Sequence, residues 1–144
     1  MPRVPTRATR RFRANTQSLS GVDSDNSLLT EHQVQREFVK WFRQTLKGIR
    51  IFAIPNGGYR SRATAMQLKV EGVSKGVPDL FCPELYLFIE MKREKGGIVS
   101  EQQKDWIDYL NSIGYTAIVC RGLDDAKMQV IEYMQTAQKF RNDQ

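Results

Sequence analysis

The chain has 144 residues, of which 40% are hydrophobic and 26% are charged. This length fits one domain, and this composition is typical of a soluble globular protein. No apolar run is long enough to span a bilayer, and no apolar core follows the charged N-terminus as it would in a signal peptide. The formal net charge of +6 weakly favours a polyanionic partner.

Residues 1–27 are rich in Arg, Ser, Thr and Pro and contain few apolar side chains. Such a segment cannot bury enough surface to offset the entropy of ordering it. We therefore expect a disordered basic N-terminal arm over 1–27 and a folded domain over 28–144. The arginines of the arm all precede its first acid, so the arm is either a phosphate-binding segment or a solvated tail.

A helix is predicted over 30–47, where Thr30 and Gln33 have the spacing of a capping box. Its inner stripe recurs at helical spacing and consists of Val34, Phe38, Trp41, Phe42 and Thr45. Glu31 extends this stripe toward the N-terminus, so its side chain can point inward. The helix pattern by itself favours a simpler role for Glu31, as a first-turn acid that complements the helix dipole.

A strand over 49–54 and a turn over 55–58 should follow, and then a helix over 61–70. Ala63, Met66 and Val70 are its predicted inward side chains. Several cations surround the glycine-containing turn and the following loop over 71–77: Arg60, Arg62, Lys69 and Lys75. They either form a solvated face or contact phosphate groups.

The centre of the chain predicts two short strands, 79–82 and 85–92, joined by a turn at Pro83 and Glu84. Strands this close in sequence should pair as an antiparallel hairpin. Side chains alternate along the second strand, so Glu90 and Lys92 share one face. Acids and a lysine at the end of a buried strand are costly to desolvate, which indicates a functional site rather than a core.

The last part of the chain predicts a helix that begins at Ser100, with Gln103 in a second capping box, a strand over 115–120 and a helix over 124–138. The predicted inward side chains of the two helices are Trp106, Tyr109, Leu110 and Ile113, and then Ala126, Val130, Met134 and Ala137. The order α-β-α-β-β-α-β-α predicts an α/β fold with a mixed central sheet flanked by helices. The two cysteines should be reduced core thiols, and a single histidine argues against zinc.

Asp79 and Glu90, on neighbouring strands, can supply two carboxylates to one Mg²⁺ ion, and the backbone carbonyl of Met91 could complete the protein's share. A divalent ion can activate water and neutralise charge during phosphodiester hydrolysis. Lys92 could orient the attacking water, and we expect the ion and a dry site to depress the pKa of Lys92.

These residues resemble a known signature. Pro78-Asp79 followed by Glu90-Met91-Lys92 resembles the PD-(D/E)xK nuclease motif. The accompanying residues narrow the resemblance to the virus-type replication-repair nuclease (VRR-NUC) domain: Glu31 with Gln35, Pro55-Asn56-Gly57-Gly58, Gly72, Gly76-Val77-Pro78-Asp79, and Gly96-Gly97-Ile98-Val99-Ser100 with Gln103 and Trp106.

The resemblance covers about residues 30–135 and implies a restriction-endonuclease-like fold. It also implies that Asp79 and Glu90 bind metal, that Lys92 is the catalytic lysine, and that Glu31 reaches the metal directly or through water. Gln103 is a site residue by the same resemblance. The candidate DNA-binding residues are Asn56, Arg60, Arg62, Lys69 and Lys75.

Small stand-alone members from phages and bacteria are similar to Holliday-junction resolvases and act as dimers. We therefore expect a homodimeric, Mg²⁺-dependent endonuclease for branched DNA, with Mn²⁺ able to substitute, in the cytoplasm (of the bacterial host if a phage encodes it). The first alternative is a flap, nick-directed or restriction-type nuclease of the same superfamily. The second alternative is a non-catalytic DNA-binding module that kept the fold.

Overall fold

The computed structural model describes residues 28–56 and 60–143. The predicted arm over 1–27 and the glycines of the 55–58 turn lie outside the described residues. The elements are α1 (Glu31–Thr45), β1 (Phe52–Ala53), α2 (Arg62–Val70), β2 (Leu80–Cys82), the 3₁₀ turn η2 (Pro83–Leu85), β3 (Leu87–Lys92), α3 (Glu101–Ser112), β4 (Thr116–Arg121) and α4 (Leu123–Asn142). The predicted order of helices and strands and the mixed α/β class are confirmed.

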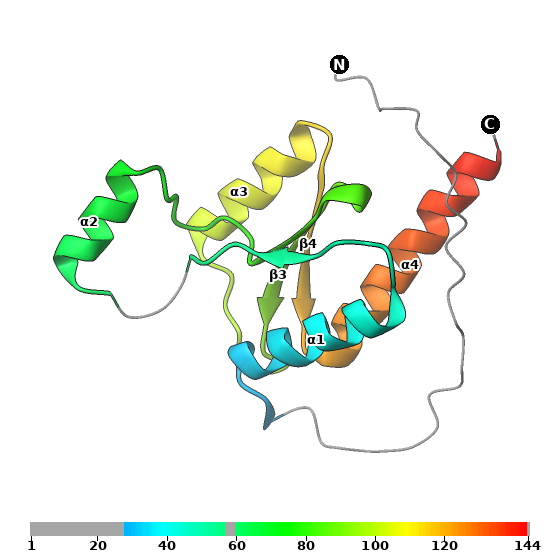
Figure 1. Ribbon diagram of the computed structural model, residues 1–144, viewed down its shortest axis with the longest axis horizontal. Helices are drawn as coiled ribbons and strands as arrows, with labels where there is room; N and C mark the ends of the chain where they lie inside the picture. Colours follow the sequence, from blue (N-terminus) through cyan, green and yellow to red (C-terminus); the bar gives the residue numbers. More distant parts are fainter. Residues whose placement is uncertain (1–27, 57–59, 144) are drawn as a thin grey trace.

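The strands form one four-stranded sheet in the order β1-β2-β3-β4 (Figure 1). β2 and β3 pair antiparallel, as predicted for the hairpin, with Leu80 opposite Ile89. β1 pairs antiparallel with β2, and β4 pairs parallel with β3, so the sheet is mixed. Around it, α1 packs on β3 and on α4, while both α3 and α4 pack on β4.

Alternation along the hairpin separates a buried face from a more open one. Leu87, Ile89 and Met91 join Phe38 and Phe42 of α1 in the hydrophobic core. The other face carries a row of contacting aromatic rings: Phe52, Phe81, Phe88, Tyr86 and Tyr115. Glu90 and Lys92 extend from this second face yet are themselves only 1% and 6% exposed.

The capping boxes at Thr30 and Ser100 both form, and they explain why α1 and α3 begin where they do. Strand β1 is shorter than predicted, since only Phe52 and Ala53 pair with β2. Cys82 and Cys120 are buried free thiols, as predicted. Among the helices of the described part, none combines the length and the apolar character that crossing a membrane requires.

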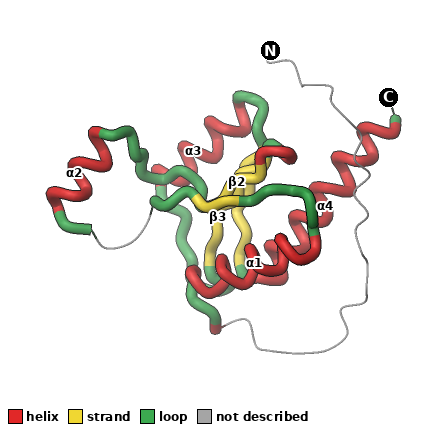
Figure 2. Tube along the Cα trace, in the orientation of Figure 1, coloured by secondary structure: helices red, strands yellow, loops and turns green. Residues whose placement is uncertain are grey.

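The prediction that α2 buries Ala63, Met66 and Val70 was wrong. No residue of α2 is buried, and Met66 and Val70 are 65% and 87% exposed. The helix stands away from the sheet at one end of the molecule (Figures 1 and 2). Its apolar spacing is helical, but no described segment packs against that face.

The prediction of which α3 side chains point inward was partly wrong. Leu110 is buried and Trp106 is half-buried, whereas Tyr109 and Ile113 are 52% and 42% exposed. This helix packs on β4, which lies at the edge of the sheet. The sheet therefore covers a narrower stripe of the helix surface than it would for a helix packed over a central strand. In α4 the prediction holds better, because Ala126 and Val130 are fully buried.

Candidate active site

The two central carboxylates lie opposite each other on the hairpin. Asp79 directly precedes β2, and the pairing of Leu80 with Ile89 puts the next antiparallel position at Glu90. The carboxylate of Asp79 accepts a hydrogen bond from the backbone N–H of Met91 at 2.8 Å. This bond fixes Asp79 against the strand that carries Glu90.

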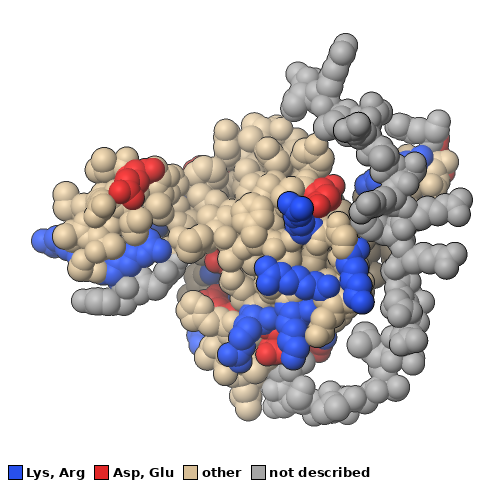
Figure 3. Space-filling model, viewed as in Figure 1, with Lys and Arg blue, Asp and Glu red and all other residues tan. Residues whose placement is uncertain are grey.

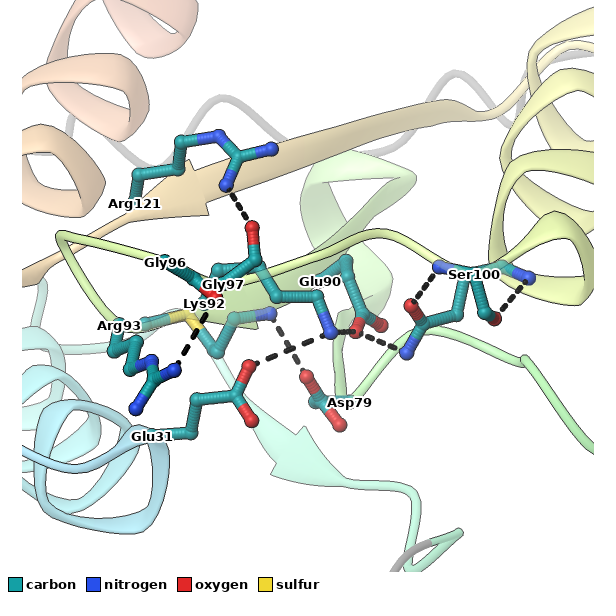
Figure 4. Close-up of polar contacts among 11 residues, drawn as sticks. Glu31, Asp79, Glu90, Lys92, Arg93, Gly96, Gly97, Ser100 and Arg121 are labelled. Atoms are coloured by element: carbon teal, nitrogen blue, oxygen red, sulfur yellow. Dashed lines mark hydrogen bonds and ion pairs between the residues drawn. The ribbon is translucent and has the colours of Figure 1, made fainter.

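Lys92 lies between acids from two different elements. Its Nζ is 3.0 Å from Oε1 of Glu90 and 3.4 Å from Oε1 of Glu31. Figure 4 shows these three side chains and Asp79 directed toward one another. Glu31 therefore points into the site from the first turn of α1, although 47% of its side chain stays exposed.

Gln103 fulfils both of its predicted geometries at once. Its Oε1 accepts the backbone N–H of Ser100 at 2.9 Å, which completes the capping box. Its Nε2 donates to Oε1 of Glu90 at 2.6 Å. The helix cap thus holds the amide in the orientation that contacts the buried carboxylate.

One oxygen of this cluster lacks a partner. Oε2 of Glu90 is buried and accepts no hydrogen bond from any described residue. An unpaired buried acceptor is costly, and more so on a charged group. Burial, and next the negative charge of Asp79, raise the pKa of Glu90 to about 7. The buried charge of Glu90 therefore destabilises the folded protein, and a cation bound at Oε2 could offset this cost.

The pKa of Asp79 is also raised, chiefly by burial, although the Met91 N–H and the charge of Lys92 act in the opposite direction. The predicted depression of the Lys92 pKa depends on a nearby cation, whereas the protein's own side chains raise this pKa. Burial alone lowers that pKa, but the hydrogen bond and charge of Glu90, together with Glu31, outweigh it. The neighbouring acids therefore favour the charged form of Lys92 when no cation is bound.

The donor set fits a hard divalent ion. Among the described residues, no three His, Cys, Asp or Glu side chains are arranged to hold a metal by themselves. Mg²⁺ does not require such a cage, because it keeps several waters and binds through one or two carboxylates. Asp79 and Glu90 could supply these, and Met91, whose carbonyl is the third predicted ligand, lies next to Glu90 on β3.

The loop after β3 covers the lysine, which sequence reasoning did not anticipate. A Cβ at Gly97 would lie 3.0 Å from Cβ of Lys92, which is tighter than an ordinary contact, so glycine at this position favours the close approach of the loop. The guanidinium of Arg121, at the end of β4, donates to the carbonyl of Gly97, and Arg93 donates to that of Gly96 at 3.3 Å. An arginine at the end of an edge strand carries no sequence signal of this contact.

The candidate DNA-binding residues separate into two groups. Asn56 donates to the carbonyl of Val77 at 3.1 Å, and Arg60 donates to that of Pro55 at 3.4 Å, so both brace the turn before α2. The others are exposed and have no such contact with a described residue: Arg62 and Lys69 on α2, and Lys75 in the following loop. All five stay candidates for phosphate contact.

Comparisons with known proteins identify the family of this chain. The family model of the VRR-NUC domain matches residues 16–124. A solved structure titled VRR_NUC domain protein is similar to this chain with 30% identity and a TM-score of 0.59, covering 74% of this chain and 89% of that one. No curated protein sequence matches. A VRR-NUC domain is a nuclease domain of the PD-(D/E)xK type, which implies DNA as the substrate. With more than half of its length matched, this chain belongs to the VRR-NUC family.

Proposed function

We propose that the protein is a Mg²⁺-dependent endonuclease that selects branched DNA and cuts it as a Holliday-junction resolvase does. The main support for metal dependence is that Oε2 of Glu90 is buried and has no hydrogen-bond partner among the described residues. It lies opposite Asp79, a second carboxylate that is half-buried. Two acids held this close favour a divalent cation between them.

Each residue then has a definite task. Asp79 and Glu90 would hold Mg²⁺, with Glu31 reaching it directly or through water; Mn²⁺ accepts the same oxygen ligands. When bound, the ion supplies charge neutralisation at the phosphate and an acidified water. Lys92, charged in the metal-free protein, donates hydrogen bonds that orient the attacking water and balance charge that develops on the phosphate.

Gln103 is a positioning residue in this scheme. Its amide holds Oε1 of Glu90, so the other oxygen of that carboxylate is the one left for the ion. The amide is fixed in turn by the N-cap of α3, so rotation of the carboxylate would break its hydrogen bond to a donor that is held in place. The same support keeps Glu90 beside Lys92 through the reaction.

Selection by DNA shape is supported by the position of the cations on α2. Arg62 and Lys69 project from a helix that stands away from the sheet (Figure 1). Such cations contact phosphates and so do not distinguish base sequences, but the contacts depend on the path of the DNA strands. A four-way junction has pseudo-twofold symmetry, so a homodimer would present one site to each of two opposed strands.

A panel of labelled substrates tests the proposal. The four-way junction, flap, nicked, splayed and linear duplex DNAs are incubated with the protein in Mg²⁺, in Mn²⁺ and in EDTA. We expect metal-dependent paired cuts in the junction and much slower cutting of linear duplex. Equal cutting of the linear duplex contradicts junction selection, and preferred cutting at a flap or nick assigns the protein to that alternative class.

A further inference from the structure

The exposed side of α1 carries a groove that the sequence did not predict as a binding surface. It has a volume of about 640 Å³ and is lined mainly by His32, Gln35, Arg36, Lys40, Arg43 and Ala53. None of its lining residues is acidic. Figure 3 shows Lys and Arg side chains gathered over α1 on the face toward the viewer. We call this surface the α1 groove.

The cations of the α1 groove form one row. Arg36, Lys40 and Arg43 are four and then three residues apart, so they lie on one side of the helix. The seven steps from Arg36 to Arg43 rise about 10 Å. Successive phosphates of one strand advance about 3.4 Å along the duplex axis and lie farther apart along the strand itself. The row therefore has the length to contact about two or three successive phosphates.

One end of the α1 groove lies near the catalytic cluster, because the charge of His32 acts on the carboxyl of Asp79. His32 lines one end of the groove and is the sequence neighbour of Glu31, whose carboxylate contacts Lys92. A strand lying in the groove would reach the two central carboxylates at its end. The groove also borders Ala53 of β1, the strand that pairs with β2 directly after Asp79.

The neighbouring charges leave the row available to a ligand. Arg36 contacts Glu37 at 3.6 Å, but the two side chains are 72% and 40% exposed, and such pairs contribute little. Arg43 donates to the carbonyl of Ile51 at 3.3 Å, which uses one of its five N–H groups and fixes its direction. Lys40 contacts no acid among the described residues.

We propose that the α1 groove binds the phosphate backbone of the DNA strand that leads to the scissile phosphate. This inference rests on the proposed nuclease function and adds a binding surface to it. The groove would position the strand without reading its bases, because Arg36, Lys40 and Arg43 meet phosphates as charges and hydrogen-bond donors. Arg36 and Lys40 are the two that substitution can remove while Arg43 keeps its contact with Ile51.

The test measures DNA binding in an Asp79→Asn background in EDTA, so that no cutting interferes. The double variant Arg36→Ala/Lys40→Ala is compared with Lys139→Ala/Arg141→Ala, which removes the same charge from the last turn of α4. Affinity for a labelled four-way junction and a labelled duplex is followed by fluorescence anisotropy over a range of salt concentrations.

The groove variant should lower the slope of log affinity against log salt by about 1.8, at about 0.9 for each phosphate that the protein no longer neutralises. Between 50 and 200 mM salt, the background protein should then lose about 12-fold more affinity than the variant. The α4 control should keep the background slope. Equal slopes for groove variant and control overturn the inference, and so does absence of DNA binding by every form.

A second arm uses proteins with Asp79 intact. The groove variant should lose kcat/KM mainly through a higher KM, because its contacts lie away from the reacting phosphate. A fall in kcat with KM unchanged contradicts a binding role. If no form cuts any DNA in Mg²⁺ or Mn²⁺, the proposed function fails, and the binding arm still decides the groove.

Discussion

The unpartnered carboxylate of Glu90 predicts that Glu90→Gln makes the metal-free protein more stable at alkaline pH. Glutamine keeps the size of the side chain and an oxygen that can accept from Lys92 and Gln103. It removes the charge that burial and Asp79 oppose. The site thus trades stability for function, as expected where a charge is held for a ligand.

The magnitude follows from linkage. The pKa of Glu90 rises from 4.5 to about 7 in the folded protein, so the unfolded chain releases this proton first. The penalty is absent below pH 4.5, grows as the pH rises toward 7 and is constant above it. At 1.36 kcal/mol per unit it amounts to about 3 kcal/mol at pH 8 and about 1 kcal/mol at pH 5. Glu90→Gln should therefore gain about 2 kcal/mol over the parent between these two pH values.

The assay is urea unfolding in EDTA at pH 5 and pH 8, for the parent, for Glu90→Gln and for Glu101→Gln. The side chain of Glu101 is 88% exposed, so this control should stay within about 0.5 kcal/mol of the parent at both pH values. Added Mg²⁺ should stabilise the parent and not Glu90→Gln. A Glu90→Gln variant that gains nothing relative to the parent between pH 5 and pH 8 would refute the reasoning about the buried carboxylate.

Asp79→Asn should abolish Mg²⁺-dependent cleavage while junction affinity stays within about twofold, because asparagine can still accept the Met91 N–H; measurable cutting would remove Asp79 as a ligand. Lys92→Met should lower the single-turnover rate on the order of a hundredfold or more. Retained rate in a variant with native circular dichroism would exclude the lysine. Gly76→Ala should cost about 2–3 kcal/mol in urea unfolding, since its φ is +91° and a Cβ would lie 2.6 Å from the Gln102 backbone. Gly72→Ala, with φ +101° and nothing within 4 Å, should cost about 1–2 kcal/mol, and equal costs for the two would show that the close approach is unimportant.

Much of the framework follows from local patterns. The turn at Pro83 and Glu84 and the alternation after it fix the hairpin, and this register alone brings residue 79 opposite residue 90. The capping boxes set the starts of α1 and α3. These features depend on residues a few positions apart, which is why the sequence could predict them.

The remaining features depend on partners that lie far away in the chain. Helical spacing allowed Glu31 to face inward but could not show that its carboxylate contacts the amine of Lys92. The same spacing gave α2 an inward face, although no described segment covers it. The sequence indicated two roles for Gln103, in the helix cap and in the site. The oxygen of its amide makes the cap contact and the nitrogen contacts Glu90, so one side chain serves both. The periodicity of a sequence predicts the direction of each side chain, but it does not identify the residues that the side chain contacts.

The detached position of α2 bears on how this protein can diversify. A helix with no buried residue contributes little to the core, so replacing its side chains should leave global unfolding nearly unchanged. Its amide hydrogens should exchange with solvent far faster than those of β3. If α2 contacts DNA as proposed, substitutions over Arg62–Val70 should change substrate preference while the hydrolytic centre stays intact, and this helix is then the place to engineer new specificity.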